Sequence, residues 1–153
     1  MIKLLIMDVD GTLTDGKIYM SASGEIMKAF NIKDGYGIAH LKESGIEPII
    51  LTGRQSKIVE NRAAELGITQ VIQGKSQKET YIYELLRRGI DKSEISYIGD
   101  DLNDLPAMKL CGLVGCPADA AKEILDIADF VSSCRGGEGA VREFIEYIME
   151  QQK

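Results

Sequence analysis

The sequence alternates short apolar runs with longer amphipathic segments, and this alternation limits the fold more than any other feature. The apolar runs are three or four residues long and are bounded by turn-forming residues, as buried strands are. Between them lie segments with apolar residues at helical spacing, so the pattern predicts a doubly wound, Rossmann-like α/β fold. Such a fold is a three-layer sandwich with a parallel sheet between two layers of helices. We expect strands at residues 4–7, 48–51, 70–72, 95–98, 112–114 and 129–131, and helices at 36–43, 55–66, 78–88, 103–110, 118–125 and 138–150.

The chain has 153 residues, which is enough for one domain, and we place that domain at residues 1–153. Four glycines each follow a predicted helix, at a position where a left-handed backbone commonly ends the helix. They are Gly45, Gly67, Gly89 and Gly112.

One segment, at residues 16–30, interrupts the alternation. Two apolar runs, Ile18–Met20 and Ile26–Phe30, flank a turn-like stretch of small residues, and this arrangement predicts a β-hairpin inserted after the first strand. The apolar residues of the hairpin cannot all face one small core. Either the hairpin folds onto its own domain or another chain covers part of it, and the residues leave both alternatives open.

The charge and cysteine content argue against several classes of protein. The net charge of −6 disfavours binding to nucleic acid. No apolar run approaches the ~18 residues of a membrane-spanning helix, and the N-terminal residues do not resemble a signal peptide, so we expect a cytoplasmic protein without a membrane partner. The three cysteines, Cys111, Cys116 and Cys134, have neither disulfide-framework nor zinc-site spacing, so we expect reduced thiols.

Acidic and hydroxyl side chains follow three of the predicted strands. Asp8 and Asp10 follow the first strand, Thr52 follows the second, and Asp100 follows the fourth. Because the carboxyl ends of parallel strands meet at one edge of a sheet, these side chains should lie close together. Clustered carboxylates repel one another unless a cation is present, and all-oxygen ligation favours a hard ion. The sequence therefore predicts a Mg²⁺ site.

The spacing of Asp8 and Asp10 suits phosphoryl transfer. In an extended chain, residues two apart leave the same face, so one carboxylate can attack while the other moves protons. Gly11 permits the positive φ that a turn after Asp10 needs. The alternative interpretation of the four residues Asp8–Gly11 is an ordinary turn or a calcium-type loop.

Thr52-Gly53 and Lys78 lie where a phosphate group could be held. Thr52-Gly53 precedes the helix expected from Gln55, whose free N–H groups favour an anion, and Lys78 opens the next helix. Taken singly, Thr52 could instead be a helix cap and Lys78 a solvated surface charge. Their occurrence together and in this order favours the phosphate interpretation.

In this order the motifs Asp8–Thr12, Leu51–Gly53, Lys78 and Gly99–Asp104 resemble those of the haloacid dehalogenase (HAD) superfamily of phosphatases. The resemblance implies that Asp8 is the nucleophile, that Asp10 protonates the leaving alcohol and then activates water, and that Thr52 and Lys78 hold the phosphoryl oxygens. It further implies that Mg²⁺ is bound by Asp8, the backbone carbonyl of Asp10 and Asp100, with Asp101 and Asp104 in its outer coordination sphere.

The spacing between the motifs leaves no room for a cap domain. Residues 11–51 hold only the hairpin and one helix, and residues 73–95 hold only one helix. An open site suits either a macromolecular substrate or a neighbouring subunit that acts as a lid. Because the net negative charge disfavours nucleic acid as that substrate, we expect an oligomer. Arg54 and Arg62 could bind a second anion beside the phosphate, such as a sugar carboxylate.

A finer likeness covers residues 15–20, 28–38, 52–54, 73–74 and 136–143, which resemble the capless, homotetrameric family of 3-deoxy-D-manno-octulosonate 8-phosphate phosphatases of lipopolysaccharide synthesis. A family acting on nine-carbon sialic-type acid 9-phosphates is the alternative, but Arg54 tends to be glutamate there. The resemblance implies hairpins packed at the tetramer centre, active sites at subunit interfaces and a flexible tail, residues 135–153, that folds over a neighbour's site. The implied substrate-binding residues are Asn31, Ile32, Lys33, Asp34, Gly35, Gly53, Arg54, Arg62, Lys78 and Arg135.

The tail can also be interpreted without the resemblance. Val141, Phe144, Ile145, Ile148 and Met149 form an apolar stripe at helical spacing, which favours packing over a binding face. The glycines before the stripe suit a loop, or a lid that moves.

Overall fold

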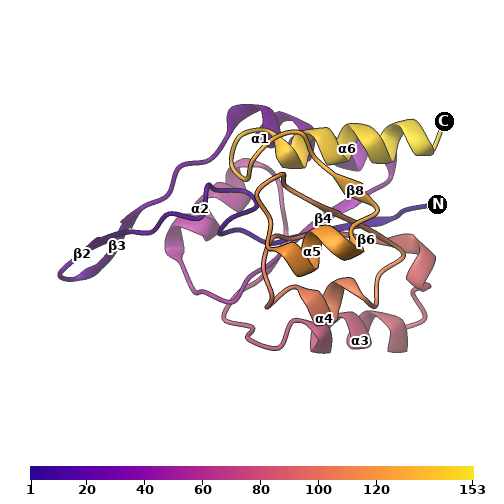
Figure 1. Cartoon of the computed structure of the whole chain (residues 1–153), viewed down its shortest axis with the longest axis horizontal. Helices are drawn as coiled ribbons and strands as arrows, with labels where there is room; N and C mark the ends of the chain where they lie inside the picture. The colour runs from indigo at the N-terminus through magenta and orange to yellow at the C-terminus, as the bar shows by residue number, and fades with distance from the viewer.

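The computed structural model describes all residues from 1 to 153, and its centre is a parallel six-stranded sheet with the strand order β5-β4-β1-β6-β7-β8 (Figure 1). The strands of this sheet are β1 (Leu4–Met7), β4 (Glu47–Leu51), β5 (Gln70–Ile72), β6 (Ile95–Ile98), β7 (Leu113–Cys116) and β8 (Phe130–Val131). The helices are α1 (Ile32–Ala39), α2 (Lys57–Glu65), α3 (Glu79–Arg87), α4 (Leu105–Met108), α5 (Lys122–Ile127) and α6 (Ala140–Gln151), with short 3₁₀ turns at Leu41–Ser44 and Lys92–Glu94.

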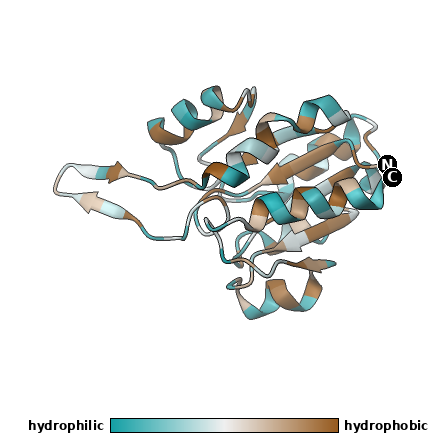
Figure 2. Cartoon of the chain, turned by 90° about the horizontal axis from the view of Figure 1, so that it is seen from above, coloured by the Kyte–Doolittle hydropathy of each residue, from teal (hydrophilic) through white to brown (hydrophobic).

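The helices cover both faces of the sheet, which confirms the predicted three-layer sandwich. Side chains alternate across β1, so that Leu5 and Met7 pack under α1, α2 and α6, whereas Ile6 packs under α3, α4 and α5. Figure 2 shows mostly hydrophobic strands at the centre and helices beside them in which hydrophilic and hydrophobic residues alternate. No cap domain interrupts the fold, as the motif spacing predicts.

The strand register brings the ends of three strands to one edge of the sheet. β1 is central, with β4 on one side and β6 on the other, and Met7 is level with both Ile50 and Ile98. The residues that follow these three strands therefore emerge at the same edge of the sheet. This edge carries Asp8, Thr52 and Asp100.

The first helix begins earlier than predicted. The prediction placed it at residues 36–43, but α1 covers Ile32–Ala39 because the Asn31 side chain accepts hydrogen bonds from the backbone N–H groups of Lys33 and Asp34. Gly35 and Gly37 weaken the helical signal in the sequence, yet the helix packs closely at both positions. A Cβ on Gly35 would lie 2.4 Å from the Arg62 guanidinium, so tertiary packing outweighs the poor helix propensity of glycine.

Other element ends also differ from the predictions. Helix α2 begins at Lys57 and not at residue 55, because the backbone N–H of Ser56 donates to the side chain of Gln73 and Ser56 stays extended. Helices α4 and α5 are shorter than expected. Gly45, Gly67 and Gly89 are left-handed as predicted, but Gly112 is not. Gly112 instead permits a close approach, since a Cβ there would lie 2.6 Å from a backbone oxygen.

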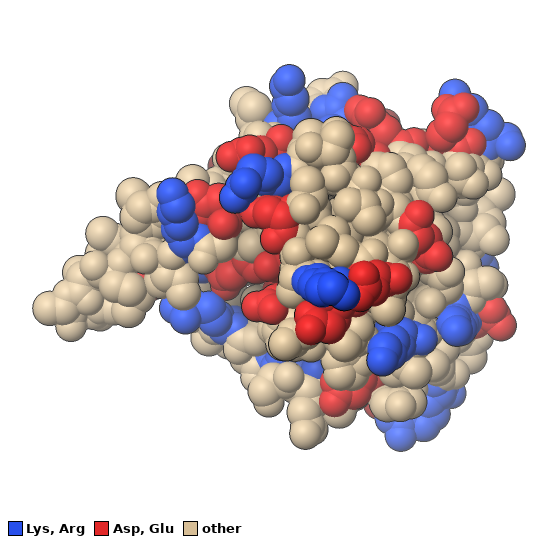
Figure 3. Space-filling model, in the orientation of Figure 1, with Lys and Arg blue, Asp and Glu red and all other residues tan.

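Strands β2 (Tyr19–Ser21) and β3 (Gly24–Met27) form the predicted hairpin, which projects from the body at the end opposite both termini (Figures 1 and 2). Four large apolar side chains of this segment are exposed: Ile18, Met20, Ile26 and Met27. In Figure 3 the tip of the hairpin shows almost no charge, whereas acidic and basic side chains gather where it joins the body. The hairpin therefore does not fold down onto its own domain.

The C-terminal segment packs against the rest of the molecule. The apolar stripe of α6, including Val141 and Phe144, is buried in the core, which confirms the packing interpretation. Gly136 lies against the loop after β1, where a Cβ would come within 1.9 Å of the carbonyl oxygen of Gly11. The movement of residues 135–153 as a lid stays a prediction. None of the helices has the length and apolar character needed to cross a membrane.

Candidate active site

Three carboxylates meet at the carboxyl edge of the sheet. One oxygen from each of Asp8, Asp100 and Asp104 lies within 4.8 Å of the others. Asp8 follows β1 directly, whereas Asp100 and Asp104 belong to the loop between β6 and α4. The positive φ of Gly11 supports this arrangement, and a Cβ on Gly11 would lie only 1.9 Å from Asp100 Oδ2. Glycine is thus required for Asp100 to reach Asp8.

Lys78 lies between two of these carboxylates and is fully buried. Its Nζ is 2.9 Å from Asp8 Oδ1 and 2.7 Å from Asp104 Oδ1. Asp8 Oδ1 also accepts a hydrogen bond of 2.8 Å from the backbone N–H of Val9. The second carboxylate oxygen of Asp8 is therefore the one left for a metal ion or a phosphorus atom. Lys78 is not the solvated surface charge of the alternative interpretation.

Asp104 organises the surrounding loop. Its Oδ1 accepts from Lys78 and from the buried hydroxyl of Tyr97, at 2.7 Å in each case, and its Oδ2 accepts from the backbone N–H groups of Asp100 and Asp101. Both oxygens are thus already occupied. Asp104 fits the predicted place outside the direct coordination of a metal, where it orients Lys78 and Asp100.

The electrostatics of this cluster favour a divalent cation. Burial, with the negative charge of Asp104, raises the pKa of Asp100 to about 6. Burial and the charges of Asp104 and Asp100 likewise hold the pKa of Asp8 well above its usual range, against the opposing effect of Lys78. Burial alone would lower the pKa of Lys78, but the two carboxylates more than offset this and raise it. Three carboxylates against one ammonium leave an excess of negative charge that a hard divalent ion would balance.

This charge excess predicts that Asp100→Asn stabilises the metal-free protein. Folding raises the pKa of Asp100, so the folded protein holds the proton of this carboxyl more tightly than the unfolded chain does. The contribution of Asp100 to the free energy of unfolding is therefore complete below about pH 4 and is lost as the pH rises through about 6. At pH 8 the ionised carboxylate costs the metal-free fold roughly 3 kcal/mol, so Asn should raise the free energy of unfolding by roughly 1–3 kcal/mol. Urea titration in the presence of a chelator measures this difference.

Two comparisons make this test specific. Asp126→Asn, which removes an exposed partner of Lys122, should change the free energy of unfolding by less than about 0.5 kcal/mol. Added Mg²⁺ should stabilise the wild type but not Asp100→Asn. A metal-free Asp100→Asn protein that is less stable than wild type at pH 8 would contradict the predicted repulsion.

Asp10 and four other predicted residues share an open cavity with Asp8. Thr52, Gly53, Arg54 and Asp101 line this cavity together with Leu102 and Asn103. The Asp10 carboxylate is not part of the Asp8, Asp100 and Asp104 cluster, and its Oδ1 receives a 2.6 Å hydrogen bond from Lys28. This separation is compatible with a proton-transfer role for the Asp10 side chain. Because α2 begins at Lys57, Thr52-Gly53 lies in the loop before that helix, and the use of the helix N–H groups to hold a phosphate stays a prediction.

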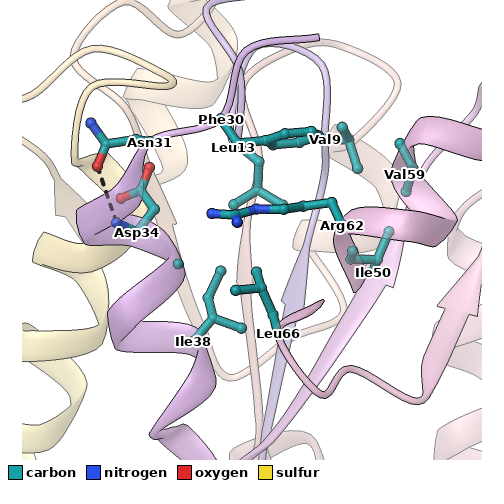
Figure 4. A pocket seen from close by; sticks show the side chains of 11 residues that line it. Val9, Leu13, Phe30, Asn31, Asp34, Ile38, Ile50, Val59, Arg62 and Leu66 are labelled. Carbon is teal, nitrogen blue, oxygen red and sulfur yellow. Dashed lines mark hydrogen bonds between the residues drawn. The ribbon is translucent and has the colours of Figure 1, made fainter. Parts of the chain in front are cut away.

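A second group of predicted substrate-binding residues lies elsewhere. Asn31, Asp34, Gly35 and Arg62 line a separate, mostly apolar pocket (Figure 4). Asp34 is buried and its Oδ1 caps α6 by accepting from the backbone N–H of Arg142, while Arg62 stacks over the ring of Phe30. Asp34 Oδ2 and Arg62 Nε have no hydrogen-bond partner. These residues do not line the Asp8 cavity.

The last three predicted residues are on the surface. Ile32 and Lys33 are exposed in the first turn of α1. Arg135 is exposed beside the loop that follows β1 and lies 3.6 Å from Asp119. Their contact with a substrate stays a prediction.

The sequence motifs give no role to Lys28, Glu25 or Tyr97, which contact the site. They also give none to the hydroxyl of Thr12, which donates to Asp100 Oδ1 at 3.0 Å. Two of these residues are unusual for their sequence context. Lys28 is a charge within an apolar hairpin run, and Tyr97 places a hydroxyl in the otherwise apolar end of a predicted strand. In both cases the partner is distant in the sequence, so only the fold identifies it.

Comparison with known proteins agrees with this geometry. The model of the haloacid dehalogenase-like hydrolase family matches residues 34–112. Over 152 residues the chain is 47% identical to the 3-deoxy-D-manno-octulosonate 8-phosphate phosphatase of Escherichia coli strain K12, in an alignment that covers 99% of this chain and 81% of that protein.

Two solved structures have the same fold. The cobalt-bound deoxy-D-mannose-octulosonate 8-phosphate phosphatase of Haemophilus influenzae superimposes with a TM-score of 0.93 at 41% identity, covering 99% of this chain and 89% of that one. The 3-deoxy-D-manno-octulosonate 8-phosphate phosphatase of Moraxella catarrhalis, solved with magnesium, phosphate and the sugar acid, gives a TM-score of 0.92 at 43% identity, covering 97% and 86%. The chain therefore belongs to the haloacid dehalogenase-like hydrolases, in the branch formed by the 3-deoxy-D-manno-octulosonate 8-phosphate phosphatases.

Proposed function

We propose that this chain is a Mg²⁺-dependent phosphatase that hydrolyses 3-deoxy-D-manno-octulosonate 8-phosphate to the free sugar acid and phosphate. The meeting of Asp8, Lys78 and Asp100 at one edge of the sheet carries the proposal. Its substrate is supported by the 47% identity to a phosphatase named for that compound. We place the reaction in the cytoplasm, in lipopolysaccharide synthesis, and the three free cysteines are in keeping with a reducing compartment.

The carboxylate cluster suits Mg²⁺ as the resident ion. Asp8, Asp100 and the backbone carbonyl of Asp10 would hold it, with Asp101 and Asp104 further out, and the donor set is entirely oxygen. When bound, the ion would neutralise charge on the phosphoryl group, so that an anionic nucleophile and an anionic ester can approach. The magnesium in the Moraxella catarrhalis structure supports this choice.

The residues of the site can perform two displacements at phosphorus. An oxygen of Asp8 attacks the phosphorus, the bond to the sugar oxygen breaks, and Asp10 gives that oxygen a proton. Water then attacks the phosphorus of the aspartyl phosphate, Asp10 takes the proton from the water, and Asp8 is released. Lys78 holds Asp8 in position throughout, because its Nζ lies 2.9 Å from Asp8 Oδ1. Thr52, which lines the same cavity, would hold a phosphoryl oxygen.

The sugar acid would be bound by residues at and beyond this cavity. Arg54 is part of the cavity and is suited to the carboxylate of the sugar acid. The pocket with Asn31, Asp34 and Arg62 lies apart from it in one subunit, so those contacts would require a neighbouring subunit. We propose a homotetramer with active sites at its interfaces, and the exposed apolar side chains of the projecting hairpin support an assembly of this kind.

A substrate panel tests the proposed function. Phosphate release is measured with Mg²⁺ for the eight-carbon 8-phosphate, a nine-carbon sialic-type 9-phosphate and p-nitrophenyl phosphate, each with a chelator control. We expect kcat/KM to be highest for the eight-carbon acid by at least about tenfold. A higher value for the nine-carbon acid would transfer the assignment to that substrate. Release from none of them would indicate a phospho-ligand-binding module without catalysis.

A further inference from the structure

Four charged side chains form a cluster where the hairpin joins the body, and we call Asp10, Glu25, Lys28 and Arg54 the root cluster. Lys28 Nζ lies 2.6 Å from Asp10 Oδ1 and 2.8 Å from Glu25 Oε2. Arg54 lies further out, with Nε 3.9 Å from Asp10 Oδ2 and Nη2 3.6 Å from Glu25 Oε2. Two acids and two bases thus balance one another beside the active-site cavity.

Lys28 is the most deeply buried member of the root cluster. Its side chain is 1% exposed, compared with 20% for Asp10, 13% for Glu25 and 46% for Arg54. Lysine is almost never buried to this extent unless it is paired, because the ammonium loses its hydration. The short contacts with both carboxylates offset that cost, and they also leave the ammonium few alternative positions.

Contacts with the body of the domain keep Lys28 directed at Asp10. Glu25 Oε1 accepts a 2.9 Å hydrogen bond from the hydroxyl of Ser56, the residue before α2. Glu25 is therefore anchored to the sheet-and-helix body, although it belongs to β3. Lys28 is held by Glu25 on one side and contacts Asp10 on the other, so the hairpin is connected to the loop that follows β1.

Lys28 does not line the cavity that holds Asp8, Asp10 and Arg54. A phosphate or sugar in that cavity would meet Asp10 and Arg54, whereas Lys28 is buried and contacts Asp10 and Glu25. Its influence on a reaction would therefore pass through the Asp10 carboxylate. This placement distinguishes Lys28 from Lys78, which contacts the predicted nucleophile itself.

We propose that Lys28 is a positioning residue that holds the Asp10 carboxylate in the orientation needed for proton transfer, and that the hairpin thereby contributes to catalysis within its own subunit. The inference rests on the proton-transfer role proposed for Asp10 and not on the identity of the sugar acid. Proton transfer depends on placement, and a displacement of about 1 Å can lower a rate by about 100-fold. Loss of the ammonium should thus be seen in kcat.

The test compares three variants: Lys28→Met, which keeps an unbranched stem but removes the ammonium, Lys28→Arg, which keeps the charge, and Lys17→Met, which changes an exposed lysine at the start of the hairpin segment. Steady-state kinetics are measured on the full chain with Mg²⁺ and p-nitrophenyl phosphate. We expect Lys28→Met to lower kcat about 10- to 100-fold with KM within about threefold of wild type. Lys28→Arg should recover part of the loss, and Lys17→Met should be unchanged.

A double-mutant cycle separates positioning from a merely structural role. In an Asp10→Asn background, Lys28→Met should change kcat by less than about twofold, because the group on which Lys28 acts is already absent. An equal loss in both backgrounds, or a loss confined to KM, would overturn the proposal. So would a kcat for Lys28→Met within twofold of wild type, or a Lys28→Arg protein as slow as Lys28→Met.

The generic ester keeps this test independent of the proposed substrate. A wild-type protein that hydrolyses p-nitrophenyl phosphate but no octulosonate phosphate would refute the proposed substrate. The kinetics of the Lys28 variants with p-nitrophenyl phosphate would still support or refute the role of Lys28. If Lys28→Met does not fold, Lys28→Ala with added methylammonium provides the second route. Recovery of at least about fivefold in kcat supports positioning, and no recovery opposes it.

Discussion

Replacement of Asp8 by Asn is expected to lower kcat by at least about 10⁴-fold for every phosphate ester, because the amide oxygen cannot act as the attacking carboxylate. The fold should be kept. Burial and neighbouring negative charges raise the pKa of Asp8, so a neutral side chain at this position suits the metal-free protein. Fixed-time phosphate-release assays measure kcat, and urea titration with a chelator measures the free energy of unfolding.

Asp15→Asn is the matched control for Asp8→Asn. Asp15 lies in the same loop after β1, but it is exposed and its carboxylate accepts only from the backbone N–H of Lys17. We expect its kcat to stay within about twofold of wild type. A purified Asp8→Asn protein that retains more than about one hundredth of wild-type turnover would require another nucleophile.

Replacement of Lys78 by Met should have the largest effect on stability. The ammonium is fully buried between Asp8 and Asp104, and its removal leaves both carboxylates without their nearest cation. Loss of one member of a buried ion pair costs about 3–5 kcal/mol, so we expect the free energy of unfolding to fall by about that amount. Turnover should fall as well, because Asp8 loses the group that orients it.

Two further variants establish the cause of that loss. Lys57→Met removes a lysine whose side chain is 81% exposed and should change the free energy of unfolding by less than about 1 kcal/mol. Lys78→Met combined with Asp104→Asn removes one charge of each sign and should be more stable than Lys78→Met alone. If Lys78→Met unfolds at the same urea concentration as wild type, the buried ion network does not stabilise the fold as described.

The carboxylate site could be predicted from the sequence because it depends on short-range rules. Each acidic residue follows an apolar run, and parallel strands bring such positions to one edge. The prediction for Asp8 and Asp100 therefore required only the strand pattern and the assumption of a parallel sheet. Their carboxylates meet as that reasoning predicts.

Other parts of the site depend on packing that the sequence pattern does not encode. The early start of α1 follows from the cap formed by Asn31, and its two glycines are accommodated because Arg62 and Arg142 pack closely over them. Lys28 reaches Asp10 only because the hairpin returns to the end of β1. Arg62 follows Arg54 by eight residues, which in one continuous helix would place both side chains on the same face. Because α2 starts only at Lys57, Arg54 lies outside the helix, and Arg62 lines a different pocket.

The structure of the C-terminal tail also depends on packing that the sequence pattern does not encode. The sequence indicates a glycine-rich loop followed by an apolar helical stripe, and both are present. The close approach of Gly136 to Gly11 explains why a side chain is not tolerated there, which the sequence alone attributes to flexibility. Because α6 contributes Val141, Phe144 and Ile148 to the core, a truncation after Cys134 would unfold the domain and could not test a lid.

Chemical trapping tests most directly whether Asp8 accepts the phosphoryl group. The protein is mixed with Mg²⁺ and substrate, quenched during turnover and treated with borohydride, which reduces an aspartyl phosphate to homoserine. Peptide mass spectrometry then locates the modified residue. We predict homoserine at position 8 only when both Mg²⁺ and substrate are present. Homoserine at another aspartate, or an unmodified Asp8 in a sample that is turning over, would contradict the account.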